Sequence, residues 1–141
     1  MNKIIAAILI LVSFSVSAGE REVEVFYGYK SHHWLSKDIT NETHHLLGVR
    51  VDNFVAGRFD NSYGRESYFV GAYGEKEYYN FELFGVVGAM RGYTKCYGDD
   101  ESNTNVCPLL AFGVSYAGLK YFKPTIYQLG DASVIGFKVE F

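Results

Sequence analysis

The sequence predicts an all-β protein, an eight-stranded antiparallel transmembrane β-barrel of the bacterial outer membrane. Three observations lead to this prediction. Aromatic residues make up 17% of the 141 residues and glycine occurs 15 times, a composition unlike that of a helical bundle. Eight short segments alternate between apolar and polar residues, as β-strands do. The links between these segments are alternately short and long, as is typical of outer-membrane barrels.

Residues 1–18 are expected to be a signal peptide and not part of the fold. Lys3 supplies a positive charge, residues 4–14 are almost wholly apolar, and small residues come before the expected cleavage point after Ala18. A membrane anchor is the alternative, but the apolar run is short for a span and charged residues follow it directly. Residues 19–141 are then expected to form a single barrel domain.

Turn residues set the boundaries of the predicted strands. The strands are Glu22–Tyr29, His44–Val51, Phe54–Phe59, Glu66–Gly74, Tyr78–Ala89, Leu109–Tyr116, Leu119–Tyr127 and Ala132–Phe141. Tight turns are expected at residues 52–53, 75–77 and 117–118, and longer links, including residues 128–131, at the other end of the barrel. An even number of strands returns both chain ends to the periplasmic side, and a terminal aromatic residue is typical of the last strand.

One face of most strands is apolar, with aromatic residues near its ends, and is expected to face lipid. The strands at 66–74 and 119–127 do not separate into two such faces. A soluble, exported sandwich or lipocalin-like barrel is the alternative. In such a protein the face opposite the apolar one would be uniformly polar, and it is not.

The opposite face, which is expected to line the lumen, changes with depth. It is polar near the chain ends, with Glu24, Arg50, Glu82 and Lys138, and apolar toward the longer links, where Arg58 is the exception. Glycines in the apolar half remove side-chain volume, and each buried CH₂ group contributes about 0.8 kcal/mol, so a pocket for a hydrocarbon chain is predicted. Aromatic side chains that fill this space are the alternative. The predicted acyl-chain pocket consists of Gly28, Leu46, Gly48, Phe84, Val86, Gly88, Leu109, Ala111, Gly113, Val134 and Gly136.

Two prolines and two cysteines add further expectations. Pro108 and Pro124 are placed toward the same end of neighbouring strands, where two missing hydrogen bonds would weaken the seam and allow a lateral gate for a lipid. Alternatively, Pro108 merely ends the preceding loop. Cys96 and Cys107 are expected to form a disulfide after export.

These features together resemble the family of small outer-membrane lipid A palmitoyltransferases (PagP-like). Residues 107–116 and 121–125 resemble the family's proline-containing seam, and residues 59–65 resemble its Phe-x-x-Ser segment at the second surface loop. The resemblance implies an acyl-chain pocket in the outer half of the lumen. It also implies transfer of a palmitoyl group from a phospholipid to lipid A, so that the partners would be outer-membrane phospholipid and lipopolysaccharide.

The family uses His, Asp and Ser residues of its surface loops as catalytic groups. The resemblance implies that His32 or His33 is the histidine and that Ser62 is the serine. In place of the family's Asp, Asn61 stands directly before Ser62, and Asp60 lies one residue earlier.

Net charge and the surroundings of the histidines argue against some classes of partner and cofactor. A net charge of −3 without a basic block argues against nucleic acid. No metal or cofactor is expected, because the four histidines have no well-placed Cys or acidic partner in the sequence. We expect a monomer that depends on the barrel-assembly machinery. A non-enzymatic surface barrel for adhesion, receptor masking or membrane stabilisation is the alternative function, and a narrow pore ranks last because charged lumen residues would block it.

Overall fold

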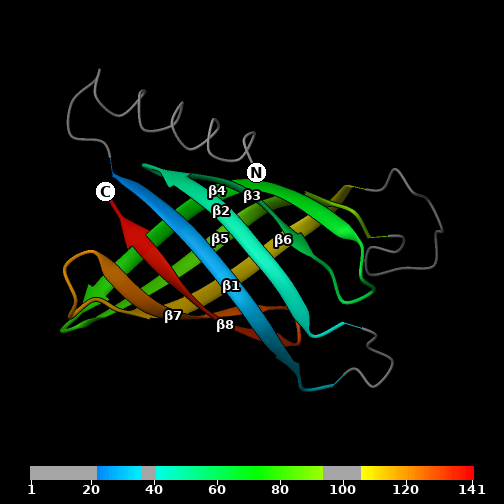
Figure 1. Cartoon of the computed structure of the whole chain (residues 1–141). Helices are drawn as coiled ribbons and strands as arrows, with labels where there is room; N and C mark the ends of the chain where they lie inside the picture. Colours follow the sequence, from blue (N-terminus) through cyan, green and yellow to red (C-terminus); the bar gives the residue numbers. More distant parts are fainter. Residues whose placement is uncertain (1–21, 36–40, 94–105) are drawn as a thin grey trace, which may run out of the picture.

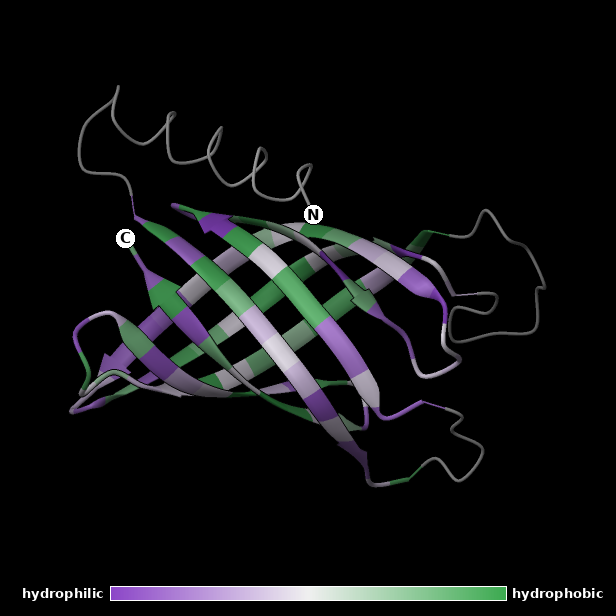
Figure 2. Cartoon of the chain, in the orientation of Figure 1, coloured by the Kyte–Doolittle hydropathy of each residue, from purple (hydrophilic) through white to green (hydrophobic). Residues whose placement is uncertain are grey.

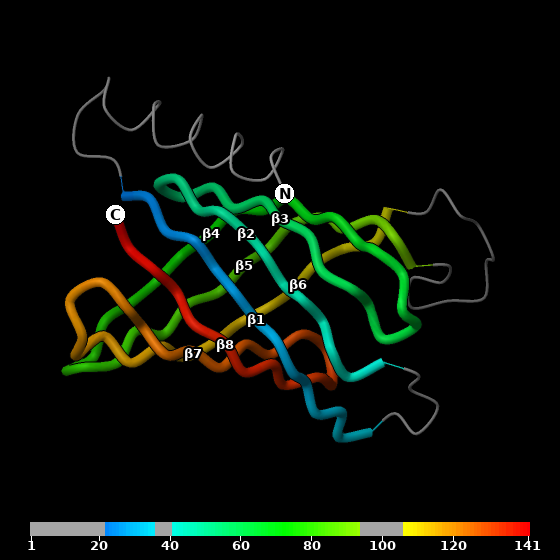
Figure 3. Tube along the Cα trace, in the orientation of Figure 1, coloured from blue at the N-terminus to red at the C-terminus, as the bar shows by residue number. Residues whose placement is uncertain are grey.

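A computed structural model describes residues 22–35, 41–93 and 106–141. It contains a closed antiparallel barrel in which the strands follow one another in chain order and β1 pairs with β8 (Figure 1, Figure 3). The strands are β1 (Val23–His33), β2 (Thr43–Val51), β3 (Phe54–Asp60), β4 (Glu66–Tyr78), β5 (Phe81–Arg91), β6 (Val106–Tyr116), β7 (Phe122–Leu129) and β8 (Ala132–Glu140). The predicted all-β class, strand number and strand order are confirmed. The predicted signal peptide lies outside the described residues.

The two ends of the barrel differ in their connections. The C-terminus and the turns after β2, β4 and β6 lie at one end, which we call the turn end, and the other connections lie at the loop end (Figure 1). The turn predicted at residues 75–77 is wrong, because β4 continues to Tyr78 and the chain reverses at Tyr79–Asn80. The long link predicted at residues 128–131 is also wrong, because only Gly130 and Asp131 separate β7 from β8.

The outward face of the barrel is mostly apolar. Hydrophobic and hydrophilic residues alternate along the strands in Figure 2. Exposed aromatic residues gather at the turn end, where Phe54, Tyr78, Phe81, Tyr116 and Phe122 form what we call the aromatic collar. Among the described residues there is no helix of the length and apolar character needed to cross a membrane.

The interior at the turn end is a compact cluster of charges, the polar floor. Its members are Glu24, Arg50, Glu75, Glu82, Lys123 and Lys138. Arg50 bridges Glu24 at 3.0 Å and Glu75 at 2.9 Å, and Lys123 bridges Glu24 at 3.1 Å and Glu82 at 2.7 Å. Lys138, which is fully buried, pairs with Glu82 and also donates to the Tyr73 hydroxyl at 3.0 Å. Each buried charge thus has a partner of opposite sign, as buried ions require, and the more exposed Glu22 and Glu140 add bridges to Arg50 at 2.7 Å and to Lys123 at 3.0 Å.

An aromatic layer covers the polar floor. Phe26 lies at the centre, with ring centroids 5.9 Å from Tyr73, 6.4 Å from Phe84 and 6.3 Å from Tyr127. The Lys138 ammonium lies 4.6 Å from the Phe84 centroid, where the ring face attracts a cation. The predicted change from a polar turn end to apolar residues above it is confirmed for the middle of the barrel, but the interior becomes polar again at the loop end, where Ser31, His44, Asn61 and Ser67 are buried.

Candidate functional site

A bulge in β1 decides which histidine faces the lumen. The register shifts between Gly28 and Lys30, so that Tyr29 and Lys30 both point outward. A bulge of this kind reverses the inward–outward alternation of the residues after it. His33 is consequently turned toward the interior, with its side chain 6% exposed. His32 is exposed and packs edge-on against Trp34, with ring centroids 4.7 Å apart.

Three side chains from distant parts of the chain meet at the loop end. The Ser62 hydroxyl, in the loop after β3, lies 3.3 Å from Nε2 of His33. Nδ1 of the same ring lies 3.4 Å from Oδ1 of Asp131, in the turn between β7 and β8. The backbone N–H of Trp34 donates to the Asp131 carbonyl at 3.2 Å, which fixes this turn against the end of β1. We refer to Ser62, His33 and Asp131 as the rim triad.

The order of atoms in the rim triad is that of a nucleophile, a base and an orienting carboxylate. An Asp131 carboxylate only accepts hydrogen bonds, so its contact with Nδ1 favours a proton there and leaves Nε2 as the acceptor for Ser62. Serine–histidine–aspartate arrangements of this kind activate a hydroxyl group for acyl transfer, and they are often loose before substrate binds.

Asn61 holds the loop that carries Ser62. This side chain is completely buried, and its oxygen accepts hydrogen bonds from the backbone N–H groups of Tyr63 at 3.0 Å and Arg65 at 3.1 Å. Its amide nitrogen donates to the Ser67 hydroxyl at 3.1 Å and to the Gly92 carbonyl at 3.0 Å. Asn61 therefore fixes the conformation of the loop, a task for which an amide with both donors and acceptors is suited.

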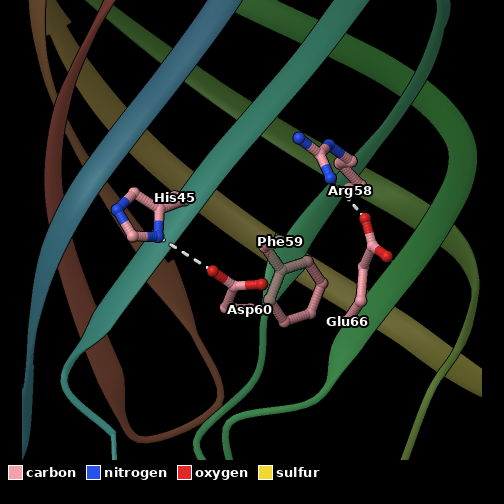
Figure 4. A pocket seen from close by; sticks show the side chains of 5 residues that line it. All are labelled: His45, Arg58, Phe59, Asp60 and Glu66. Carbon is pink, nitrogen blue, oxygen red and sulfur yellow. Dashed lines mark hydrogen bonds and ion pairs between the residues drawn. The ribbon is translucent and has the colours of Figure 1, made fainter.

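Asp60 points away from the rim triad. Its carboxylate lies 2.8 Å from Nδ1 of the exposed His45. Together with the ion pair between Arg58 and Glu66, this contact borders a cavity of about 130 Å³, also lined by Phe59 (Figure 4). The prediction that Arg58 lies in the lumen is wrong, since its side chain is 47% exposed on the outward face of β3.

The residues predicted to form the acyl-chain pocket lie along the inward face, and their neighbours occupy the space beside two of the glycines. A Cβ atom on Gly28 would lie 2.9 Å from Cγ1 of Val134 and 3.2 Å from Leu46. A Cβ atom on Gly113 would lie 2.8 Å from Cε1 of Phe84. The remaining members of that set are Gly48, Val86, Gly88, Leu109, Ala111 and Gly136, all buried or half-buried. Aromatic and branched side chains of this inward face, among them Phe59, Leu109 and Tyr127, pack into one hydrophobic cluster in the described part of the barrel.

The two prolines lie near opposite ends of the barrel. Pro108 follows the start of β6 at the loop end, whereas Pro124 follows the start of β7 at the turn end. The expectation that they share one end is therefore wrong. Regular pairing between β6 and β7 runs only from Ala111–Leu129 to Ser115–Thr125, so each proline lies just outside the paired stretch. Whether this seam opens as a lateral gate stays a prediction.

The expected disulfide also stays a prediction. Cys107 is buried in β6, at 1% exposure, while Cys96 lies outside the described residues.

The structure adds a member to the site that sequence reasoning missed. Asp131 supplies the carboxylate beside His33, whereas the resemblance had directed attention to Asn61 and Asp60, next to Ser62. Its only signal in the sequence is its place beside Gly130 between two strand patterns, and that place does not indicate which loop it faces.

Comparison of the chain with protein-family models and with curated proteins finds no match.

Proposed function

We propose that this protein is an acyltransferase of the bacterial outer membrane that moves a palmitoyl group from a glycerophospholipid to lipid A. The rim triad of Ser62, His33 and Asp131 is the observation that carries the proposal. The apolar outward face and the aromatic collar support a place in a lipid bilayer. In that setting the loop end would face the outer leaflet, where lipopolysaccharide supplies an acceptor hydroxyl group.

The rim triad can activate that acceptor. Ser62 gives its proton to Nε2 of His33 and takes the proton of the acceptor hydroxyl, while Asp131 stabilises the resulting imidazolium. The acceptor oxygen attacks the ester carbonyl carbon of the phospholipid, and the bond from that carbon to the glycerol oxygen breaks. His33 returns the proton to the glycerol oxygen, so the products are acylated lipid A and a lysophospholipid.

An acyl chain bound in the lumen would have to displace packed side chains. Leu46 and Val134 lie against Gly28, and Phe84 lies over Gly113. The glycines give these neighbours room to change rotamer, and the displaced contacts would be replaced by contacts with the alkyl chain. Each CH₂ group that enters contributes about 0.8 kcal/mol, which offsets the rearrangement.

Mass spectrometry of lipid A tests the proposal. Cells that express the wild-type chain should contain lipid A with an added palmitate. Ser62→Ala and His33→Ala should remove the added mass, while Ser133→Ala should retain it, because Ser133 lies at the same end but bonds to Trp34 and Gln128. Unmodified lipid A with the folded wild-type protein, or palmitate that persists in both triad variants, would refute the mechanism.

Asp131→Asn is expected to reduce kcat by about 10-fold to 100-fold, the usual contribution of a hydrogen bond to a charged group. The neutral amide orients His33 less firmly and does not stabilise the imidazolium. KM for the phospholipid should stay within about twofold, because Asp131 is not proposed to contact the donor. Asp52→Asn is the matched control, since Asp52 lies in the turn between β2 and β3 at the opposite end. A change in KM alone would contradict the orienting role.

The packed upper lumen favours a second candidate, a surface barrel without enzymatic activity. In that case the aromatic layer serves only to fill the interior, as the rings of Phe26, Tyr73 and Phe84 do in this conformation. The mass-spectrometric experiment separates the two candidates, since such a barrel leaves lipid A unchanged.

A further inference from the structure

A second serine–histidine pair lies beside the rim triad. The Ser31 hydroxyl, near the end of β1, lies 2.6 Å from Nε2 of His44, near the start of β2. Both residues are 4% exposed. The bulge that turns His33 inward also turns Ser31 inward, because residues two positions apart in a strand lie on the same face. This contact is shorter than the one between Ser62 and His33.

Hydrogen bonds determine which nitrogen of His44 carries the proton. Nδ1 lies 2.5 Å from the backbone carbonyl oxygen of Asp60, at the end of β3. A carbonyl oxygen only accepts, so Nδ1 must be the donor, and in the neutral ring Nε2 is left as the acceptor. The Ser31 hydroxyl also lies 3.4 Å from the Glu42 carbonyl oxygen, but its contact with Nε2 of His44 is much shorter, at 2.6 Å. The hydroxyl proton is therefore directed at the lone pair of His44, which is how a general base activates a serine nucleophile.

The pair stands between the rim triad and the apolar lumen. The His44 ring centroid lies 5.9 Å from that of His33 and 6.5 Å from that of Phe59. An ester whose alkyl chain enters the lumen would bring its carbonyl group to the depth of His44. Burial of Ser31 also excludes water, which would otherwise hydrolyse an ester formed there.

We propose that Ser31, activated by His44, is a nucleophile that carries the acyl group as a covalent ester. The inference rests on the proposed function, which supplies a glycerophospholipid as donor, and it replaces the direct attack of the acceptor on that donor by two steps through Ser31. Nε2 of His44 takes the hydroxyl proton, and Oγ of Ser31 attacks the ester carbonyl carbon. The bond to the glycerol oxygen breaks, and that oxygen takes the proton from His44 and leaves with the lysophospholipid. The acceptor hydroxyl, deprotonated at the rim triad, then attacks the Ser31 ester; its proton goes to Oγ of Ser31, which is released as a hydroxyl group.

The two serine–histidine pairs thus divide the reaction. Ser31 and His44 act on the donor, and the rim triad acts on the acceptor. A divided reaction explains why two imidazoles lie side by side at one end of the barrel, each hydrogen-bonded to its own serine.

An alkyl fluorophosphonate tests the proposal, because it phosphonylates an activated serine with loss of fluoride and does not require lipid A. The folded wild-type protein in detergent micelles is treated with the probe, and the modified serine is located by tandem mass spectrometry. We expect the label on Ser31, none in Ser31→Ala, and labelling slower by about 100-fold or more in His44→Gln, since a general base contributes at least that much. Ser62→Ala should be labelled at the wild-type rate. Ser115→Ala is the matched control, because Ser115 is also buried but bonds to Thr125 and not to a histidine.

The outcomes separate this inference from the proposed function. A label on Ser62, or an unlabelled Ser31, overturns the inference, and palmitate on lipid A in the same cells would leave the proposed function in place. A label on Ser31 without palmitate on lipid A supports the nucleophile and refutes the proposed acceptor. Location of the label in the wild-type protein decides the matter even if His44→Gln fails to fold.

Discussion

Lys138→Met is expected to lower the free energy of unfolding by about 3–5 kcal/mol, the usual cost of breaking a buried ion pair from one side. Lys138 is 0% exposed, as is Glu82, its partner in the polar floor. Methionine fills a similar volume but leaves the floor with one uncompensated negative charge. It also removes the hydrogen bond to the Tyr73 hydroxyl. Urea unfolding of the refolded barrel in detergent micelles, followed by far-ultraviolet circular dichroism, gives the value.

A paired substitution and a surface control make the experiment specific. Glu82→Leu combined with Lys138→Met removes one charge of each sign and should recover much of the lost stability, because apolar replacement of a buried pair is often neutral. Lys76→Met, on an exposed lysine above the Tyr78 ring, should change stability by less than about 0.5 kcal/mol. If Lys138→Met costs no more than this surface change, water solvates the floor and direct ion pairing does not stabilise it.

Gly136→Ala is expected to open the seam between β1 and β8. It should lower the free energy of unfolding by about 3 kcal/mol or more, which is at the upper end of what overpacking costs. Gly136 pairs with Gly28 across this seam. A Cβ atom at position 136 would overlap the backbone carbonyl of Tyr27 and would lie 2.7 Å from Cα of Gly28. Backbone atoms have no rotamer by which to move away, so the strands themselves must separate.

The difference in mobility between unheated and heated samples on denaturing gels shows whether the barrel remains closed, and urea unfolding gives the size of the loss. Gly74→Ala is the matched control, because a Cβ atom there meets nothing within 4 Å. That variant should be neutral or more stable by about 0.5 kcal/mol, since alanine restricts the unfolded chain. Equal stability of the two alanine variants would show that the seam tolerates a wider spacing.

The number and order of the strands were predictable because turn residues and alternation are local signals. Which residues of β4 and β7 face the lumen could not be predicted. The inward residues of β4 include Ser67, Phe69, Tyr73 and Glu75, and those of β7 include Lys123. Polar and aromatic groups alternate with outward apolar residues there, so hydropathy alone does not separate the faces. Their inward placement depends on partners supplied by other strands, such as Arg50 for Glu75.

The sequence indicated which residue types form the candidate site, but it identified only some of the individual residues. His33 and Ser62 were named from the resemblance, and the structure brings them within 3.3 Å. Asp131 could not be found because its contact with His33 joins residues 98 positions apart. The pair of Ser31 and His44 could not be found because Ser31 faces inward only as a result of the bulge in β1. The choice between His32 and His33 depended on a bulge, and a strand pattern contains no sign of one extra residue.

That bulge also affects how this chain should be compared with its evolutionary relatives. Relative to β8, Tyr29 is an extra residue that shifts the rest of β1 by one position, so a homologue without it would direct the neighbouring imidazole into the barrel. Two aligned proteins can therefore share the residues Ser-His-His-Trp and still direct different histidines into the lumen. Conservation at these columns is informative only once the gap has been placed from strand pairing.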